Sequence, residues 1–371
     1  MTSPEQRIST GVQGLDEIAY GGLLPQRAYL VRGGPGGGKT TLSLHFLAAE
    51  TEGTGLYVSL GENGGQVRAQ SQQLKIPDGK IQFADGVHFM RLTDRGMQVF
   101  PRLIPDNRQA PCDPVTLSTG VEEIDALLGG GIERGTVSVL SGPTGVGKTT
   151  LGMQIMRTAA LRGERAVVYS FEEQPRILKH RCRSLSMPLD DLLEQDQLHI
   201  ETVEAVSYSP DELSHSVREE VEINNTRLVM LDSLSGYKLS VGRLSVAGDD
   251  VVERLHALCR YLVSRGVTVL ILNEIASIAG NEVRATDSGI SYLADTIVML
   301  RYVEFNSELR KTIGVLKKRT SDFERSLRAF EITPNGLNVG EPLKGLQGIL
   351  HGQPHFVDTH RNQTAPEEKT I

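Results

Sequence analysis

The residues best suited to chemistry lie in a glycine-rich loop. Residues 142–149 read GPTGVGKT, which fits the phosphate-binding pattern G-x-x-x-x-G-K-[ST], here called the P-loop. Glycines let backbone N–H groups turn inward around phosphates. We expect Lys148 to neutralise phosphate charge in binding and catalysis, and the Thr149 hydroxyl to bind Mg²⁺. The expected nucleotide-binding set is Gly142, Pro143, Thr144, Gly145, Val146, Gly147, Lys148, Thr149 and Thr150.

Two acidic positions follow apolar runs further along the chain. Asp232 ends the run LVMLD, so we expect it at the carboxyl end of a buried neighbouring strand, where α/β sheets bind ligands, as the second magnesium-holding residue. Glu172 and Glu173 follow the run 166–170. Adjacent acids can simply begin a helix. Beside a P-loop and Asp232, we favour a catalytic base that orients the attacking water.

The P-loop occurs twice. Residues 33–40 fit the same pattern, and residues 8–47 align with 117–156 without a gap, at the offset of 109 that separates Lys39 from Lys148. Such self-similarity predicts two related domains in tandem. We therefore add Gly33, Gly38, Lys39 and Thr40 to the expected nucleotide-binding residues.

The first copy is shorter than the second. After Lys39 only about one helix–strand–helix unit fits, ending near Leu74, before a predicted β-hairpin around residues 94–96. Gly61 and Glu62 replace the acidic pair, and no apolar strand ending in Asp follows. We expect this half to bind nucleotide weakly or not at all and to act structurally.

The second copy alternates predicted strands and helices. A helix is predicted to begin at Ser209-Pro210, and Leu255, Leu258 and Leu262 keep helical spacing. This order predicts an α/β fold, a mostly parallel twisted sheet with helices on both faces, preceded by a truncated copy of the same fold. Predicted strands cover 136–140, 166–170, 198–201, 227–232, 267–273, 296–301, 312–316 and 327–332. The predicted domains are 1–106 (truncated), 107–114 (linker), 115–351 (complete) and 352–371 (a disordered tail).

Composition narrows the class of protein. The formal net charge is −7 over 371 residues, which argues weakly against a protein that mainly grips nucleic acid. Three cysteines without a C-x-x-C pair indicate neither zinc nor a disulfide framework. The first residues lack an apolar leader, and no apolar run reaches the ~20 residues of a membrane helix. We expect a cytoplasmic protein without a membrane partner.

Together these features resemble the KaiC family of the RecA superfamily. The matching stretches are 118–125, 142–149, 171–173, 231–233, 290–296 and 315–319. The resemblance implies a RecA-like P-loop NTPase fold, ATP and Mg²⁺ as cofactors, and hydrolysis of ATP. It also implies self-association into hexameric rings, with ATP bound between neighbours and signalling proteins as further partners.

The resemblance also assigns roles to residues. It implies that Glu172 and Glu173 are catalytic, and that Lys317 and Arg319 reach the γ-phosphate bound by a neighbouring subunit. A solvated basic strand end is the alternative for Lys317 and Arg319. Ser291 matches the first of two autophosphorylated positions in the clock member of the family, but Tyr292 occupies the second, so serine/threonine autokinase activity stays open. If it exists, Ser291 is the candidate acceptor, with Tyr292 and Ser288 as less favoured alternatives.

Two other functions remain open. One is a DNA-handling ATPase of the RecA or RadA type, with pore loops at 237–248 and 276–289. Those segments hold few cations, and Tyr237 is their nearby aromatic residue. The other is a non-catalytic scaffold switched by nucleotide, against which the intact acidic residues argue. The sequence names neither the process nor the partner.

Overall fold

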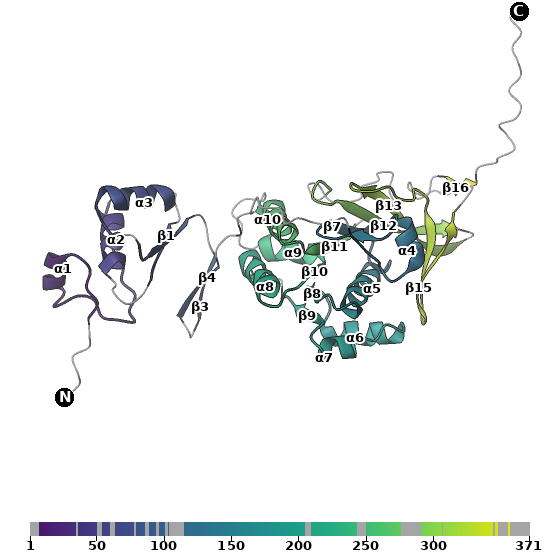
Figure 1. Cartoon of the computed structure of the whole chain (residues 1–371), viewed down its shortest axis with the longest axis horizontal. Helices are drawn as coiled ribbons and strands as arrows, with labels where there is room; N and C mark the ends of the chain where they lie inside the picture. The colour runs from purple at the N-terminus through teal and green to yellow at the C-terminus, as the bar shows by residue number, and fades with distance from the viewer. Residues whose placement is uncertain are drawn as a thin grey trace, which may run out of the picture. The chain divides into compact units, whose positions relative to one another are not determined.

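The computed structural model divides the chain into two compact units, residues 1–102 (unit 1) and 103–371 (unit 2), each described by itself (Figure 1). The residues it describes are 7–34, 36–49, 54–59, 64–77, 79–85, 89–93, 96–100, 103, 115–204, 209–242, 250–275, 291–305, 307–343, 346–347 and 355–356. The predicted linker 107–114 lies outside these residues, as does the predicted tail 352–371 except for 355–356.

Unit 2 is built on a nine-stranded sheet in the order β15-β14-β13-β12-β7-β11-β10-β8-β9. The strands from β12 to β9 in this order are parallel, and β13, β14 and β15 extend the sheet antiparallel. Their bounds are β7 Val137–Gly142, β8 Ala166–Ser170, β9 Leu198–Thr202, β10 Leu228–Asp232, β11 Thr268–Glu274, β12 Thr296–Phe305, β13 Glu308–Lys318, β14 Arg328–Thr333 and β15 Gly336–Pro342. The expected α/β fold is confirmed.

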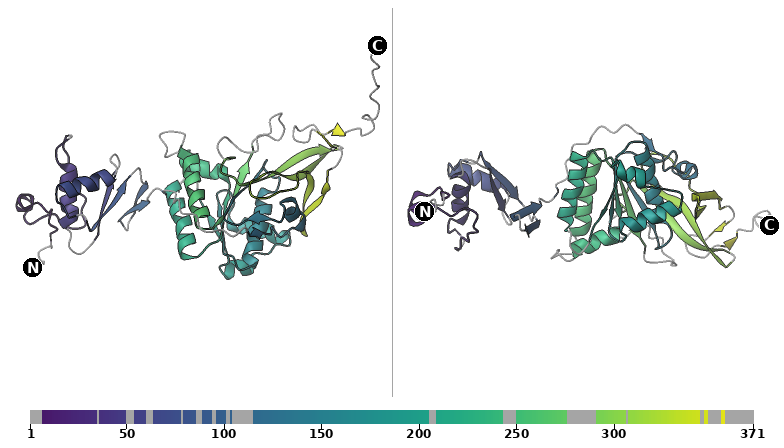
Figure 2. Two further views of the ribbon diagram at one scale, coloured as in Figure 1. Left: turned by 45° about the horizontal axis from the view of Figure 1, so that its top comes forward. Right: turned by 90° about the horizontal axis from the view of Figure 1, so that it is seen from below.

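Alternation along the parallel strands separates two apolar cores. Val168, Met230 and Leu272 point to one face, where helices α4 Glu122–Leu127, α5 Lys148–Leu161, α6 Pro175–Ser184 and α7 Asp190–Glu194 pack. Val167 and Val229 point to the other, beneath α8 Pro210–Ile223, α9 Leu234–Gly242 and α10 Asp250–Ser264. Figures 1 and 2 show these two helical layers on either side of the sheet. A strand buried on both faces explains the continuous apolar runs in the sequence.

Several local predictions are confirmed. Ser209 caps α8: its hydroxyl accepts from the Glu212 N–H at 3.2 Å, and the Glu212 carboxylate accepts from the Ser209 N–H at 2.7 Å. The spacing of Leu255, Leu258 and Leu262 belongs to α10, which buries all three. The predicted strands correspond to β7–β14, with boundaries shifted by a few residues where the pattern weakens.

One prediction is wrong. The loop expected from residue 237 begins instead as helix α9, and the Tyr237 side chain is buried against Phe171, with ring centroids 6.5 Å apart. Leu234 and Tyr237 are three residues apart and both buried, as in a helix, but Gly236 and Ser240 are poor helix formers and weaken the sequence signal. Residues 243–249 and 276–290 lie outside the described residues.

Unit 1 contains a much smaller sheet. Its elements are α1 Gln13–Ile18, α2 Lys39–Ala49, β1 Gly55–Ser59, α3 Gly64–Gln73, β2 Ile81–Asp85, β3 Phe89–Thr93 and β4 Gly96–Phe100. β1 pairs in parallel with β2, and β3 with β4 forms the predicted hairpin. The sequence prediction missed β2, whose sequence IQFAD ends in Asp85, so the expectation that no apolar strand ending in Asp follows the first P-loop is wrong. Leu44, Val67, Ile76 and Ile81 form the small core.

The two units repeat details of hydrogen bonding at the offset of 109. The Asp16 carboxylate accepts from the backbone N–H of Thr10 at 2.7 Å, and Asp125 accepts from that of Thr119 at 2.7 Å. The two units differ in the next segment of the alignment. Residues 28–33, which align with β7, form no strand, and Leu30 is 91% exposed.

The smaller elements of unit 2 lie at its edges: β5 Thr116–Leu117 pairs with β6 Ile132–Glu133, and β16 Leu346–Gln347 with β17 His355–Phe356. Cys182 and Cys259 are buried free thiols, and burial raises their pKa values to about 11 and about 12. Within the described residues, no helix combines the length and apolar character that crossing a membrane requires.

Candidate active site

The P-loop of unit 2 joins the end of β7 to the start of α5, as its motif requires. Gly145 and Gly147 have φ of +75° and +118°, conformations that side chains with a Cβ rarely adopt. A Cβ on Gly142 would lie 2.4 Å from the Leu300 carbonyl oxygen. The loop therefore needs glycine both for its backbone conformation and for its close approach to β12.

Lys148 is held over this loop. Its ammonium group donates to the carbonyl oxygens of Gly142 at 2.8 Å and Pro143 at 2.9 Å, and the residue is 8% exposed. Burial lowers the pKa of Lys148, while the nearby carboxylates of Glu274, Asp232 and Glu172 act in the opposite direction. The cation thus stands among three acidic side chains.

Asp232 and Thr149 lie together at the carboxyl edge of the sheet. The Thr149 hydroxyl donates to the Asp232 carboxylate, which is 6% exposed. Burial, together with the nearby carboxylates of Glu172 and Glu173, raises the pKa of Asp232 to about 6, although the Thr149 hydrogen bond and Arg181 act in the opposite direction. The strand order corrects one expectation: β10, which carries Asp232, is not the neighbour of β7, because β11 lies between them.

This environment fits a magnesium ion. A buried carboxylate surrounded by like charge gains from a divalent cation, and Mg²⁺ prefers oxygen ligands such as the Thr149 hydroxyl and Asp232. In the described part of the chain, no cluster of three or more His, Cys, Asp or Glu is placed to hold a metal by itself. Phosphate oxygens and water would therefore complete the ligands, as is usual for Mg²⁺.

The two adjacent glutamates have different surroundings. Glu172 is exposed and accepts a hydrogen bond from the hydroxyl of Ser233, the residue that follows Asp232. Glu173 forms an ion pair with Arg181 of α6, with 2.6 Å between Nη1 and Oε1. Glu172 is thus directed toward the end of β10 that carries Asp232, whereas Glu173 is held by its ion pair with α6.

Sequence reasoning missed Glu274. It ends β11, the strand between β7 and β10, and its carboxylate accepts a hydrogen bond from the Thr144 hydroxyl of the P-loop. The available signal resembled that for Asp232: an acid follows the mostly apolar run 267–272 after one intervening residue, Asn273.

Lys317 and Arg319 lie toward the amino ends of the parallel strands, whereas their own P-loop follows the carboxyl end of β7. Lys317 pairs with Ile297, which pairs with Val139 of β7, two residues after that strand begins. The Lys317 ammonium donates to the carbonyls of Ser291 and Ala294, both at 2.7 Å. At ~3.3 Å per strand residue, Val139 lies about 10 Å along β7 from Gly142, where the P-loop begins.

Arg319 is also engaged at that end of the sheet. Its guanidinium forms an ion pair with Asp295 at 3.3 Å and donates to the Tyr292 carbonyl at 2.8 Å. Lys318 is different, because its ammonium is buried and pairs with Glu133 at 3.1 Å. Ser291 itself is exposed. Ser288, an alternative acceptor in the sequence analysis, lies outside the described residues.

The P-loop of unit 1 repeats the lysine contacts without a strand before it. The Lys39 ammonium donates to the carbonyls of Gly33 at 2.8 Å and Gly34 at 2.7 Å. Gly38 has φ of +76°, and Thr40 follows in α2. β2 is the next strand after β1 and pairs with it, as β9 follows and pairs with β8, so no described strand of unit 1 takes the place of β10.

A protein-family model described as "ATPase: KaiC" matches residues 8–99 and 117–344. The chain belongs to the KaiC ATPase family. This confirms the resemblance found in the sequence. One matched segment lies in unit 1 and the other in unit 2. Family membership accounts for the P-loop, the parallel sheet and the acids at its carboxyl edge.

Individual KaiC proteins are similar at a moderate level. The circadian clock protein KaiC3 of Synechocystis sp. is 26% identical over 278 residues, which cover 72% of this chain and 52% of that protein. The circadian clock oscillator protein KaiC of Synechococcus elongatus is 27% identical over 269 residues, 72% of this chain and 50% of that protein. The chain thus spans about half the length of the relatives it matches.

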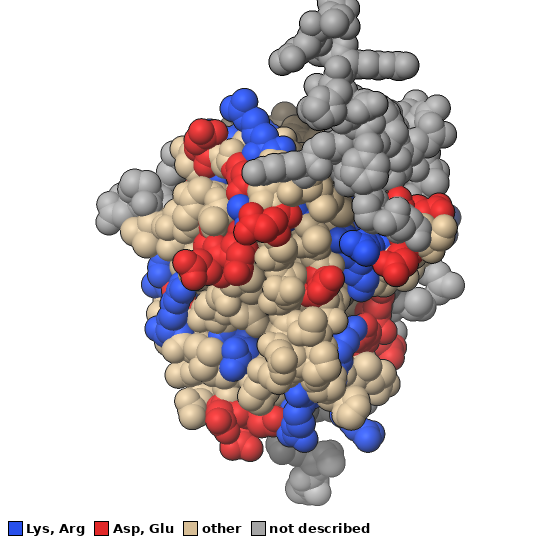
Figure 3. All heavy atoms as spheres, turned by 90° about the vertical axis from the view of Figure 1, so that its right-hand side faces the viewer, with Lys and Arg blue, Asp and Glu red and all other residues tan. Residues whose placement is uncertain are grey.

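The DNA-handling alternative gains little from the described surface. On the face shown in Figure 3, Lys and Arg alternate with Asp and Glu rather than forming a continuous basic stripe. Tyr237, the aromatic residue expected beside a pore loop, is fully buried and cannot stack on a base.

Proposed function

We propose that this chain hydrolyses ATP with Mg²⁺ at the P-loop of unit 2. The observation that carries the proposal is the linked set of contacts at one edge of the sheet. Thr149 donates to Asp232, Ser233 donates to Glu172, and Lys148 lies among the acids. Phosphate binding, magnesium binding and a base for water are all supplied within this set.

Each residue then has a defined task. The P-loop backbone and Lys148 bind the β- and γ-phosphates, while Thr149 and Asp232 hold Mg²⁺, which neutralises charge on the transferred phosphoryl group. Glu172 accepts the proton of the attacking water, since it is exposed and directed to this edge. Glu173 remains paired with Arg181 and positions the segment.

The decisive experiment follows γ-labelled ATP with Mg²⁺, counting released phosphate and protein-bound label together. Wild-type chain should release phosphate, and Glu172→Gln should reduce the rate by ~10²–10³ while retaining ATP binding. Glu194→Gln, on α7, is the matched control. ATP binding without turnover in the wild type would instead favour the nucleotide-switched scaffold.

We further propose that Lys317 and Arg319 act on the nucleotide of a neighbouring subunit in a hexameric ring. Their position toward the amino ends of the parallel strands, away from their own P-loop, supports this, because a finger placed there cannot reach nucleotide in its own chain. Such a finger stabilises charge in the transition state. The whole-protein activities of the relatives remain proposals for this chain, which spans half their length.

Ser291 is the proposed phosphoacceptor. It is exposed, and its carbonyl oxygen binds Lys317, so a neighbour's γ-phosphate that reaches Lys317 would also approach Ser291. Retention of label on wild-type chain, absent in Ser291→Ala, would support autophosphorylation. Release of phosphate with no retained label would leave an ATPase alone.

We propose that unit 1, residues 1–106 in the predicted domain division, binds nucleotide weakly or not at all. Residues 28–33 before its P-loop form no strand, and Gly61 replaces one of the two acids that follow the corresponding strand in unit 2. Titration of fluorescent ATP against Lys148→Ala should give little residual binding. Tight binding that Lys39→Ala then removes would contradict this.

A further inference from the structure

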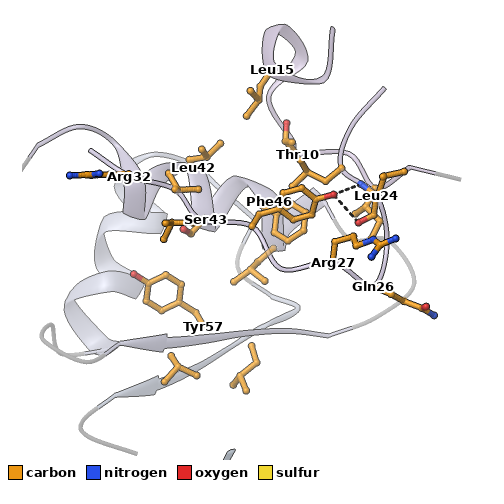
Figure 4. A pocket seen from close by; sticks show the side chains of 18 residues that line it. Thr10, Leu15, Leu24, Gln26, Arg27, Arg32, Leu42, Ser43, Phe46 and Tyr57 are labelled. Atoms are coloured by element: carbon orange, nitrogen blue, oxygen red, sulfur yellow. Dashed lines mark hydrogen bonds between the residues drawn. The ribbon is translucent and has the colours of Figure 1, made fainter. Parts of the chain in front are cut away.

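Unit 1 contains an apolar cavity of about 760 Å³ (Figure 4). One wall is the segment 29–32, another is α2, and the third is β1. Among the lining residues are Tyr29, Leu30, Leu42, Phe46, Leu56 and Tyr57. Leu30 is 91% exposed and Leu56 is 46% exposed, so the cavity holds apolar side chains that water reaches. Contiguous exposed apolar surface of this kind marks interaction sites.

Unit 2 shows what fills the corresponding volume. There β10 and β11 lie between β8 and β7. At Gly152 of α5, an added Cβ would lie 2.6 Å from the Met230 sulfur and 3.5 Å from a Leu272 methyl. Ser43 is the residue of unit 1 that aligns with Gly152, and it lines the cavity. Two apolar strands therefore occupy in unit 2 the place that is open in unit 1.

The edges of the cavity are suited to main-chain pairing. β1 pairs with β2 on one side, and among the described residues no strand pairs with its other side. In unit 2 the other side of β8 is occupied by β10. A free strand edge exposes N–H and C=O groups that an extended peptide can pair with.

The charges of the cavity wall define the occupant further. Arg27 and Arg32 lie on opposite sides of the opening, and no Asp or Glu is among the lining residues (Figure 4). In unit 2 the strand beside β8 is β10, which ends in Asp232. Two arginines without an acid among the lining residues favour an acidic residue at the carboxyl end of the docked segment as well.

We propose that this cavity is a docking site for an extended apolar segment of a partner protein, which adds to the free edge of β1 and carries an acidic residue at its carboxyl end. The segment covers Leu30, Phe46 and Leu56 with alternate side chains. Main-chain hydrogen bonds provide affinity, and the apolar wall with Arg32 provides selectivity.

The test uses a dye-labelled peptide with the sequence of residues 267–274, VTVLILNE, extended by an uncharged solubilising tail. Fluorescence anisotropy measures its binding to the full chain. Saturable binding is expected, weakened at least tenfold by Leu30→Asp or Leu56→Asp. Because both side chains are exposed, these changes leave the fold intact. Tyr20→Asp, at a residue 88% exposed outside the cavity, is the matched control.

Two further measurements complete the test. A peptide with Lys in place of its final Glu should bind at least threefold more weakly, and hydrogen exchange should show slower exchange of the amides at 56–58 when the peptide is bound. Absence of saturable binding, or equal binding to Leu30→Asp, overturns the proposal. Self-association of the peptide-free chain that Leu30→Asp abolishes would assign the cavity to a second copy and would also overturn it. None of these readouts depends on ATP hydrolysis.

Discussion

The ionised carboxylate of Asp232 is electrostatically unfavourable in the nucleotide-free site. Its carboxyl group is buried, accepts from Thr149 and faces the acidic side chains of Glu172 and Glu173. In the ordinary range its pKa would be 3.8, but here it is about 6. The fold therefore binds a proton at this position more tightly than the unfolded chain does. A cation at the site removes that preference, which links magnesium binding to stability.

The first prediction concerns pH. Because the folded pKa of Asp232 is raised, its effect on the free energy of unfolding is unfavourable above about pH 6 and disappears below about pH 4. Asp232→Asn should raise the free energy of unfolding of the nucleotide-free chain at pH 7.5 by ~1–3 kcal/mol, with no gain at pH 4. Urea denaturation at the two pH values measures this. An equal gain at both would show that the carboxylate charge is not the cause.

The second prediction concerns Arg181. Its ion pair with Glu173 offsets one of the charges around Asp232. Arg181→Met should lower kcat by about tenfold through misplacement of residues 172–173, with a smaller change in KM. Arg181→Lys should recover part of the rate. Arg176→Met, an exposed position on the same helix, should behave as wild type. A change in KM alone would limit Arg181 to nucleotide binding.

At the scale of elements, the P-loop depends on strand β14 as well as on its own glycines. A Cβ on Gly147 would lie 2.6 Å from the Ile332 Cδ1 and 3.1 Å from the Phe330 ring. The loop is thus packed under a strand that follows it by more than 180 residues.

The third prediction separates this contact from backbone strain. Gly147→Ala and Gly163→Ala both place alanine at positive φ, +118° and +82°, but only the first meets neighbouring atoms. We expect Gly163→Ala to cost ~1 kcal/mol and Gly147→Ala ~2–4 kcal/mol, because the clash adds to the strain. Urea unfolding of unit 2 measures both. Equal losses in the free energy of unfolding would mean that β14 moves to accommodate the added methyl group at no measurable cost.

Much of unit 2 could be predicted because its strands are buried on both faces. The run 228–231 is apolar and an acid follows it, so the sequence alone located β10 and the carboxylate at its end. Strand order was not accessible, since insertion of β11 between β7 and β10 is a long-range pairing with no local signal. The same limit hid the contact of Glu274 with Thr144 and the Arg181–Glu173 pair, because in each case the partner comes from a different element.

At the scale of the whole molecule, the fourth prediction tests whether the active site is shared between subunits. Lys148→Ala removes the P-loop cation, and Arg319→Ala removes the finger, so each variant alone should lack activity. When the two variants are mixed, the intact P-loop of an Arg319→Ala chain can meet the intact Arg319 of a neighbouring Lys148→Ala chain. Partial recovery of phosphate release is expected. No recovery, with mixed oligomers formed, would show that both residues serve the same chain.

In the proposed oligomer, Lys317 and Arg319 lie toward the amino end of β7 and the P-loop follows its carboxyl end, so each subunit would have a head and a tail. Head-to-tail contacts are heterologous, so they close only as a ring or continue as an open row. In an open row the first P-loop meets no finger, whereas a closed ring leaves none unmatched. Ring closure would then itself be the event that completes the last site, and turnover per chain would rise with protein concentration more steeply than ATP binding does.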